Sequence, residues 1–381
     1  MRDVVILGST GSIGTQALEI IANNPHEFRV IALTCAGSNP TAIIEQAKKF
    51  NVQYVGVINN GETIRAALPG VHVIDGLEAS TQIAAMECDV VLNAITGSIG
   101  LGPTLAALEA GNILALANKE SLVAGGDLVM SKAQINQIIP VDSEHSAIWQ
   151  CAQAGSRSEI RKLVLTASGG PFSDRTDLEG VSIEDALAHP TWSMGAVVTI
   201  NSATLVNKGL EIIEAHHLFS MPYENIDAVI HPQSVVHSLV EFFDGSTIAQ
   251  ASPPNMKGAI AYALNWPERL ANSTQPIDWT HSHNWSFSPI DAQRFPAVDL
   301  ARHCGQGGGA LPAIFNAANE VAVDAFLTNT LKFSSIVGIV ATVVNDYDNG
   351  AAVTVRDLAD VSAIEEDARM KTREHLIRLA P

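Results

Sequence analysis

The sequence has few cysteines and few basic residues, and each shortage excludes a class of protein. Its 381 residues include four scattered cysteines without a C-x-x-C pair, so we expect neither a zinc site nor a disulfide framework. Lys and Arg total 22 against 40 Asp and Glu, a formal net charge of −18, which argues against a nucleic-acid partner. Any bound phosphate must then be held by a few local cations and backbone amides.

The sequence also lacks a long apolar run. No stretch reaches the length of a membrane-spanning helix, and the N-terminal residues enter a strand pattern without a signal region, so we expect a cytoplasmic protein with no membrane partner. Hydrophobic residues make up 47% and charged residues 16%, a composition typical of soluble enzymes. The chain is longer than a single hydrophobic core usually organises, which predicts two or three domains.

A glycine-rich turn follows the first predicted strand. Residues 3–8 form an apolar strand pattern, the turn Gly8-Ser-Thr-Gly11-Ser-Ile-Gly14 comes next, and a helical pattern runs from Thr15 to Asn23. Glycines at such a turn let a pyrophosphate approach the N–H groups of a helix N-terminus. The strand and helix on either side predict a dinucleotide site, the alternative being an ordinary strand-to-helix turn.

The turn after the second predicted strand, Arg29 to Thr34, bears on coenzyme choice. It carries Gly37, Ser38 and Asn39 and has no acidic residue. An acid there would bind the ribose hydroxyls of NAD and repel a 2′-phosphate. Its absence, with two hydrogen-bonding side chains in its place, favours NADPH.

Further strands are expected at 54–57, 71–74, 90–94 and 113–117, alternating with helices, which predicts a doubly wound parallel sheet. Small and polar residues end two of these strands, at Ala94 and at Asn118. Ligands bind at the carboxyl ends of parallel strands. Lys119 could therefore reach a substrate oxygen, although a surface lysine is the alternative.

Three acidic residues form a candidate metal site. Asp142 and Glu144 stand two residues apart, and on extended chain their side chains would point the same way. In a helix, Asn207 and Glu211 would share one face, with Lys208 beside them. A set of carboxylates without thiolates suits a hard cation such as Mg²⁺ or Mn²⁺, with Co²⁺ also considered, whereas solvated surface charges are the alternative.

A short segment between Pro190 and Gly195 carries Trp192 and Met194. We interpret residues 186–196, which include His189, as a mobile flap whose apolar side chains cover a ligand and exclude water. A static core loop is the alternative interpretation.

The second half of the chain predicts a different architecture. Strands are expected over 227–243 and 247–251 around a turn at Asp244-Gly245, and His231 and His237 are interpreted as structural or interfacial. Such an open sheet could pair across a two-fold axis, which predicts a homodimer. A polar connection is expected over 174–186, and helices over 311–327, 333–347 and 361–379 with a break at 348–350.

We therefore expect an α/β protein with four parts. They are a Rossmann-like doubly wound parallel sheet that binds NADPH (1–141), a central α+β catalytic and dimerisation domain with an open sheet (142–265), a linker (266–294) and a C-terminal helical bundle (295–381).

Several motifs in order resemble those of the 1-deoxy-D-xylulose 5-phosphate reductoisomerase family, and the resemblance covers nearly the whole chain. The matching stretches are Gly8–Gly14, Asn118–Ser121, Val141–His145, Ala167–Phe172, His189–Gly195, Asn207–Glu211 and His231–Ser234. The resemblance implies a metal-dependent rearrangement of 1-deoxy-D-xylulose 5-phosphate. It also implies an NADPH-dependent reduction to 2-C-methyl-D-erythritol 4-phosphate, in the non-mevalonate route to isoprenoid precursors.

The resemblance also implies roles for particular residues. Asp142, Glu144 and Glu211 would bind the metal and, with Lys119, form the catalytic set. The sugar phosphate would contact Lys119, Ser143, Glu144, Ser168, His189, Trp192, Ser202, Asn207, Lys208 and Glu211. NADPH would contact Gly8, Thr10, Gly11, Ser12, Ile13, Gly37, Ser38, Asn39, Ala94, Asn118, Glu120 and Gly195. The chain departs from the family pattern at Ser38, where many members have a basic residue, and at Asn255, where Asp is usual.

Two other functions remain open from the sequence. A plain NADP-dependent dehydrogenase would reduce a carbonyl without rearrangement and would need no acidic triad. A non-catalytic NADP-binding regulator would leave Lys119 and the three acids without a task.

Overall fold

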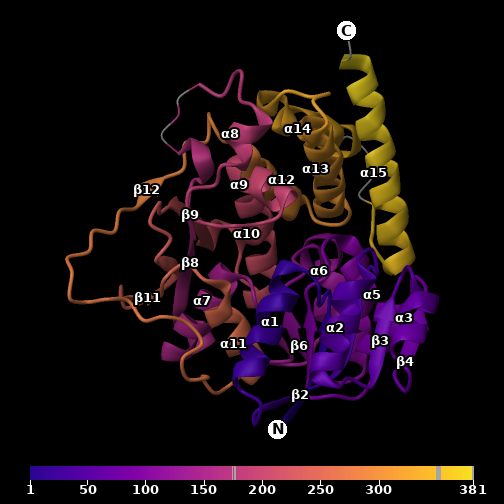
Figure 1. Cartoon of the computed structure of the whole chain (residues 1–381). Helices are drawn as coiled ribbons and strands as arrows, with labels where there is room; N and C mark the ends of the chain where they lie inside the picture. The colour runs from indigo at the N-terminus through magenta and orange to yellow at the C-terminus, as the bar shows by residue number, and fades with distance from the viewer. Residues whose placement is uncertain (174, 176, 349–352, 380–381) are drawn as a thin grey trace. The chain divides into compact units, whose positions relative to one another are not determined.

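The computed structural model describes residues 1–381 except Asp174, Thr176, 349–352 and 380–381 (Figure 1). Asp174 and Thr176, in the predicted polar connection, and Asn349 and Gly350, in the predicted helix break, therefore lie outside the described residues. The chain forms two compact units. Unit 1 comprises Met1–Ser121, Val129–Trp149 and Asn255–Gln275, and unit 2 comprises Leu122–Leu128, Gln150–Pro254 and Pro276–Pro381.

Unit 1 is built on a seven-stranded sheet in the order β4-β3-β2-β1-β5-β6-β7. All neighbouring strands are parallel, and the strand order reverses between β1 and β5, as in a doubly wound sheet. The predicted Rossmann-like sheet is confirmed. Its strands are β1 (Arg2–Leu7), β2 (Phe28–Cys35), β3 (Tyr54–Val57), β4 (His72–Asp75), β5 (Val90–Asn93), β6 (Ile113–Leu116) and β7 (Ile138–Pro140).

Helices connect these strands because apolar residues recur at helical spacing between them. In α1, Ala17, Leu18, Ile20 and Ile21 are buried. The helices of this unit are α1 (Ser12–Asn23), α2 (Pro40–Phe50), α3 (Gly61–Ala67), α4 (Ala79–Ala84), α5 (Leu101–Glu109), α6 (Glu120–Lys132), α7 (Ser143–Cys151) and α11 (Met256–Asn265). Residues 122–128 of α6 and 150–151 of α7 belong to unit 2.

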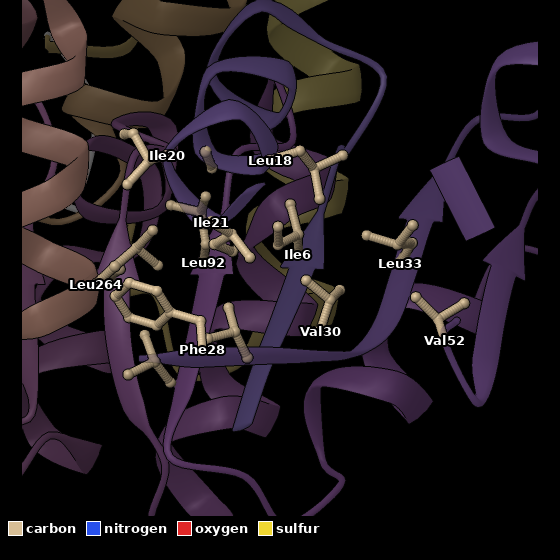
Figure 2. Close-up of a cluster of buried hydrophobic side chains, with 14 of the residues drawn as sticks. Ile6, Leu18, Ile20, Ile21, Phe28, Val30, Leu33, Val52, Leu92 and Leu264 are labelled. Carbon is tan, nitrogen blue, oxygen red and sulfur yellow. The ribbon is translucent and has the colours of Figure 1, made fainter. Parts of the chain in front are cut away.

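The core of unit 1 lies around the central strands. Ile6, Leu33 and Leu92 are fully buried, and Leu18 of α1 and Leu264 of α11 belong to the same cluster (Figure 2). Burying one such side chain stabilises the fold by about 1.5–3 kcal/mol. Helix α11, which the sequence did not predict, therefore completes a core that begins with the first strand of the chain.

Unit 2 contains a mixed five-stranded sheet in the order β11-β10-β8-β9-β12. Strands β8 and β9 are parallel, whereas β10 is antiparallel to both β8 and β11, which confirms the hairpin predicted at Asp244-Gly245. A two-residue strand in the predicted linker pairs with the edge of β9. The strands are β8 (Ile160–Ala167), β9 (Ile226–Ile230), β10 (Val236–Phe242), β11 (Thr247–Ala251) and β12 (Ser288–Pro289).

The helices of unit 2 include the three that the sequence predicts near the C-terminus, α13 to α15, which pack against one another. Helix α12 was not predicted. The unit contains α8 (Ile183–Leu187), α9 (Ala196–Ala203), α10 (Val206–Phe219), α12 (Ala297–Gly307), α13 (Leu311–Leu327), α14 (Ile336–Asp348) and α15 (Leu358–Leu379). Within the described ranges, no helix has both the length and the apolar character needed to cross a membrane.

Candidate active site

The glycine turn between β1 and α1 forms a close-packed cradle. Gly8 has φ +79°, and the N–H groups of Gly8 and Ser9 donate to the carbonyl of Thr34 at 3.0 and 2.9 Å. A Cβ on Gly14 would lie 2.4 Å from the carbonyl oxygen of Gly8, and a Cβ on Gly8 would lie 2.6 Å from that of Ala94. Only glycine fits at these two positions.

The N-terminus of α1 suits an anion. Gly11 is its N-cap and provides no side-chain cap, and the first turn contains no acidic residue. The opening N–H groups of a helix lack intrahelical acceptors and lie at the positive end of its dipole. The backbone N–H groups of Ser12 and Ile13 lie at this end of the helix, and the cradle fits the pyrophosphate of a dinucleotide.

Neighbouring strands of unit 1 deliver further predicted residues to the carboxyl edge of the sheet. Ala94 follows β5, Asn118 and Lys119 follow β6, and Asp142 follows β7, so they end neighbouring strands in the order β1-β5-β6-β7. The side-chain amide of Asn118 donates to the carbonyls of Ile95 and Gly97, each at 2.8 Å. Asn118 thereby ties the loop after β5 to the loop after β6.

Asp142 and Glu144 lie at the N-terminus of α7. The predicted extended conformation is wrong, because β7 ends at Pro140. The N–H of Ser146 donates to the carbonyl of Asp142, so Asp142 is the N-cap of α7. The two residues still offer carboxylate oxygens within 4.8 Å of each other. The positive end of the helix dipole favours two carboxylates here.

Polar partners surround this acidic pair within unit 1. The Nζ of Lys119 lies 2.9 Å from Oδ2 of Asp142, with both side chains 16% exposed. The hydroxyl of Ser143 donates to Oε2 of Glu144 at 2.5 Å. His145, for which no role was predicted, is buried, and its Nδ1 lies 3.9 Å from Oδ2 of Asp142. Its spacing of three residues from Asp142 was the signal for this contact.

In unit 2, Glu211 lies on the first turns of α10, as the i, i+4 spacing predicts. Its Oε1 accepts a hydrogen bond from Nδ2 of Asn207, and its Oε2 accepts one from Nζ of Lys208. Glu211 and Lys208 are 1% and 3% exposed. The donor chemistry of Glu211, Asp142 and Glu144 is oxygen only, which fits Mg²⁺ or Mn²⁺.

A second group of predicted residues gathers where α9 meets α10. Gly170 has φ +63°, and a Cβ there would lie 3.0 Å from the carbonyl oxygen of Ser202, so the loop that carries Ser168 packs on the end of α9. Leu205, buried and in the left-handed conformation at φ 59°, joins α9 to α10. This turn joins the end of α9, which carries Ser202, to the start of α10, which carries Asn207 and Lys208.

His189 is held in one tautomer beside Ser168. Its Nδ1 accepts from the N–H groups of Thr191 and Trp192 at 3.1 and 2.9 Å, so the proton is on Nε2 and is donated to Oγ of Ser168 at 2.9 Å. Burial lowers the pKa of His189, which keeps the ring neutral. The N–H of Gly170 also donates to Oγ of Ser168, at 3.1 Å. Ser168 therefore has its own hydroxyl hydrogen left to donate to a ligand.

The segment predicted as a flap connects α8 to α9. Trp192 is partly buried, and its ring centroid lies 6.2 Å from that of His237. Gly195 is the N-cap of α9. Whether this segment opens and closes stays a prediction.

Comparison with known proteins shows the same relationship along the whole chain. The sequence-family model of 1-deoxy-D-xylulose 5-phosphate reductoisomerase matches residues 4–126. Two family models of C-terminal domains of that enzyme match residues 138–219 and 251–371. The curated enzyme of that name from Streptomyces avermitilis is 54% identical over 388 residues, covering 99% of this chain and 98% of the relative. The one from Rhodococcus jostii is also 54% identical, over 374 residues, covering 97% and 93%.

Solved structures agree. The Zymomonas mobilis 1-deoxy-D-xylulose 5-phosphate reductoisomerase in complex with NADPH has a TM-score of 0.92 and 39% identity, covering 98% of this chain and 99% of that chain. A DOX-P reductoisomerase in complex with NADPH, fosmidomycin and magnesium has a TM-score of 0.93 and 37% identity over the full length of both chains. The chain therefore belongs to the 1-deoxy-D-xylulose 5-phosphate reductoisomerase family.

Proposed function

We propose that this chain rearranges 1-deoxy-D-xylulose 5-phosphate and reduces the product with NADPH to 2-C-methyl-D-erythritol 4-phosphate. One observation carries the proposal. The carboxyl edge of a single parallel sheet presents a dinucleotide cradle after β1 and, after β6 and β7, Lys119 with the Asp142 and Glu144 carboxylates. A plain dehydrogenase would use the cradle but would leave the acidic pair without a task.

Asp142, Glu144 and Glu211 are the proposed ligands of one divalent cation. Carboxylate oxygens are the ligands that such cations prefer in proteins. When bound, the cation supplies a Lewis acid for the oxygens of the substrate, and NADPH supplies the hydride. Lys119, whose Nζ lies 2.9 Å from Oδ2 of Asp142, donates a hydrogen bond to a substrate oxygen on which negative charge develops.

The phosphate end of the substrate is assigned to the turn between α9 and α10 in unit 2. Ser168 donates its hydroxyl, because its oxygen already accepts hydrogen bonds from His189 and Gly170. Ser202 adds a second hydroxyl, and Lys208 adds a positive charge held in place by Glu211. Together with the Asn207 amide, this set matches a phosphate dianion.

Trp192 is proposed to cover the bound substrate, with the flap excluding water from the reacting atoms. His189 connects the flap to the phosphate site, since the same ring accepts from the flap backbone and donates to Ser168. A phosphate bound at Ser168 would therefore act on the flap through the hydrogen bonds of His189.

A homodimer is the proposed assembly. Strand β11 is an edge of the unit 2 sheet and is exposed over Thr247–Ala249, and Phe243 beside the hairpin is 69% exposed. An uncovered edge with an exposed aromatic residue suits pairing with a second copy. Sedimentation of the purified chain tests this, and a monomer at micromolar concentration contradicts it. The domain roles assigned from the sequence and a cytoplasmic location remain proposals as well.

The deciding experiment is NADPH oxidation by the purified chain with 1-deoxy-D-xylulose 5-phosphate, with and without Mg²⁺ or Mn²⁺. We expect metal-dependent oxidation and a branched product, identified by nuclear magnetic resonance. Full-rate reduction after removal of metal, or an unbranched product, would indicate a plain dehydrogenase instead. Tight NADPH binding without turnover would indicate a regulator.

A further inference from the structure

Two asparagines after β3 hold the loop that follows β2. The N–H and the side-chain amide of Asn59 donate to the carbonyl of Ala36 at 3.0 and 3.2 Å. The side-chain amide of Asn60 donates to the carbonyl of Gly37 at 2.9 Å. The carbonyls of Ala36 and Gly37 therefore both accept hydrogen bonds from the neighbouring loop.

The two loops approach each other as closely as their backbones allow. Gly37 has φ +80°, and a Cβ there would lie 2.1 Å from the carbonyl oxygen of Asn59, so no other residue fits. Asn60 is in the left-handed conformation at φ 60°, which asparagine tolerates better than most residues. Backbone contact and the Asn60 side chain thus determine one conformation for residues 36–38.

This conformation orients one backbone donor. The carbonyl of Gly37 and the N–H of Ser38 belong to the same trans peptide, so they point in opposite directions. Because Asn60 engages the carbonyl, the N–H of Ser38 is turned away from Asn60, and no acceptor for it is found within the described part of the chain. Ser38 is exposed, and residues 36–39 include no acid.

We propose that Asn60 is a positioning residue that determines the preference for a 2′-phosphorylated dinucleotide. It holds the Gly37 carbonyl so that the N–H and hydroxyl of Ser38 are presented together to the 2′-phosphate. Asn60 itself does not contact the coenzyme. This rests on the proposed use of NADPH. It explains how a loop that carries Ser38 in place of a basic residue can still select the phosphorylated coenzyme, by orientation of neutral donors instead of charge.

The test compares Asn60→Gly with Asn51→Gly in the full-length chain. Glycine adopts the left-handed conformation freely, so Asn60→Gly keeps the backbone and removes only the hydrogen bond. Asn51 is also left-handed, at φ 50°, but ends α2 and makes no side-chain hydrogen bond to residues 36–39. Dissociation constants for NADPH and NADH are measured from the fluorescence of the reduced nicotinamide, without turnover.

We expect Asn60→Gly to weaken NADPH binding on the order of five- to tenfold, the effect of one neutral hydrogen bond, and to leave NADH binding unchanged. Asn51→Gly should change neither constant. A second variant, Asn60→Asp, tolerates the same backbone but cannot donate to Gly37, so it should also lose NADPH selectively. As competitors of the reduced coenzyme, adenosine 2′,5′-bisphosphate should bind both Asn60 variants more weakly than the unmutated chain, whereas adenosine 5′-monophosphate should bind them equally well.

Equal weakening of NADPH and NADH by both Asn60 variants would reduce Asn60 to a structural residue and overturn the inference. So would unchanged NADPH binding. These outcomes differ from failure of the proposed coenzyme, which appears in the unmutated chain as NADPH bound no more tightly than NADH.

Discussion

Glu211→Gln tests two separate tasks of one carboxylate, the stabilisation of Lys208 in the protein interior and the proposed binding of the cation. Glu211 and Lys208 are 1% and 3% exposed, and their charged groups are hydrogen-bonded. Glutamine keeps the size of the side chain and an acceptor oxygen but removes the charge. Loss of one partner from a buried ion pair costs about 3–5 kcal/mol, because the remaining charge stays in a medium that solvates it poorly. The retained acceptor places our expectation at the lower end, about 3 kcal/mol of unfolding free energy.

The double variant Glu211→Gln with Lys208→Met separates stability from chemistry. Replacing both charges with groups of similar size is often neutral for stability, so most of the lost unfolding free energy should return. Turnover should remain absent in both variants, because neither restores the proposed cation ligand. NADPH affinity should survive in both, since the cradle after β1 lies in the other unit.

Unfolding free energy is measured by urea titration followed by tryptophan fluorescence, NADPH affinity by nicotinamide fluorescence, and turnover by NADPH oxidation. If Glu211→Gln loses NADPH affinity as strongly as it loses activity, the separation of the two sites is mistaken. If Glu211→Gln alone retains turnover, Glu211 serves the fold and is no cation ligand.

Three further outcomes are expected. Ser38→Asp should reverse or flatten the preference for NADPH over NADH, because a carboxylate repels the 2′-phosphate; an unchanged ratio of kcat/KM would show that another group holds this phosphate. Trp192→Ala should lower kcat/KM substantially and leave folding intact. Proteolysis between Ala186 and Ala196 should slow when a substrate analogue and NADPH are bound. Equal cleavage rates with and without these ligands would identify a static loop. Burial lowers the pKa of His217 from 6.5 to about 4, so the unfolded state takes up the proton first and stability should fall as pH drops from 6.5 to about 4, by roughly 3 kcal/mol in total. His217→Gln should flatten this part of the pH profile of urea unfolding, and an unaltered slope would assign it to other groups.

Asp142 and Glu144 show how a correct pairing can follow from a wrong local structure. Extended chain was expected at these residues, because alternate residues of extended chain share a face. In the structure they lie at the start of α7, where the cap and the first turn also bring their oxygens within 4.8 Å. Strand β7 ends just before them at Pro140, but nothing local distinguished a continued strand from a helix start, because a helix cap depends on backbone hydrogen bonds formed later in the chain.

Local sequence was enough to specify the features that repeat over a few residues. Strand, glycine turn and helix over residues 2–23 follow from a continuous apolar run, two obligatory glycines and helical spacing, and the contact of Asn207 with Glu211 follows from their separation of four residues. Three other contacts depend on the tertiary fold: Lys119 with Asp142, His189 with Ser168, and Asn60 with Gly37. Those contacts join loops that lie more than twenty residues apart in the sequence, and their partners depend on the order of strands and helices and on how closely two backbones approach. No periodicity within a single segment encodes either quantity.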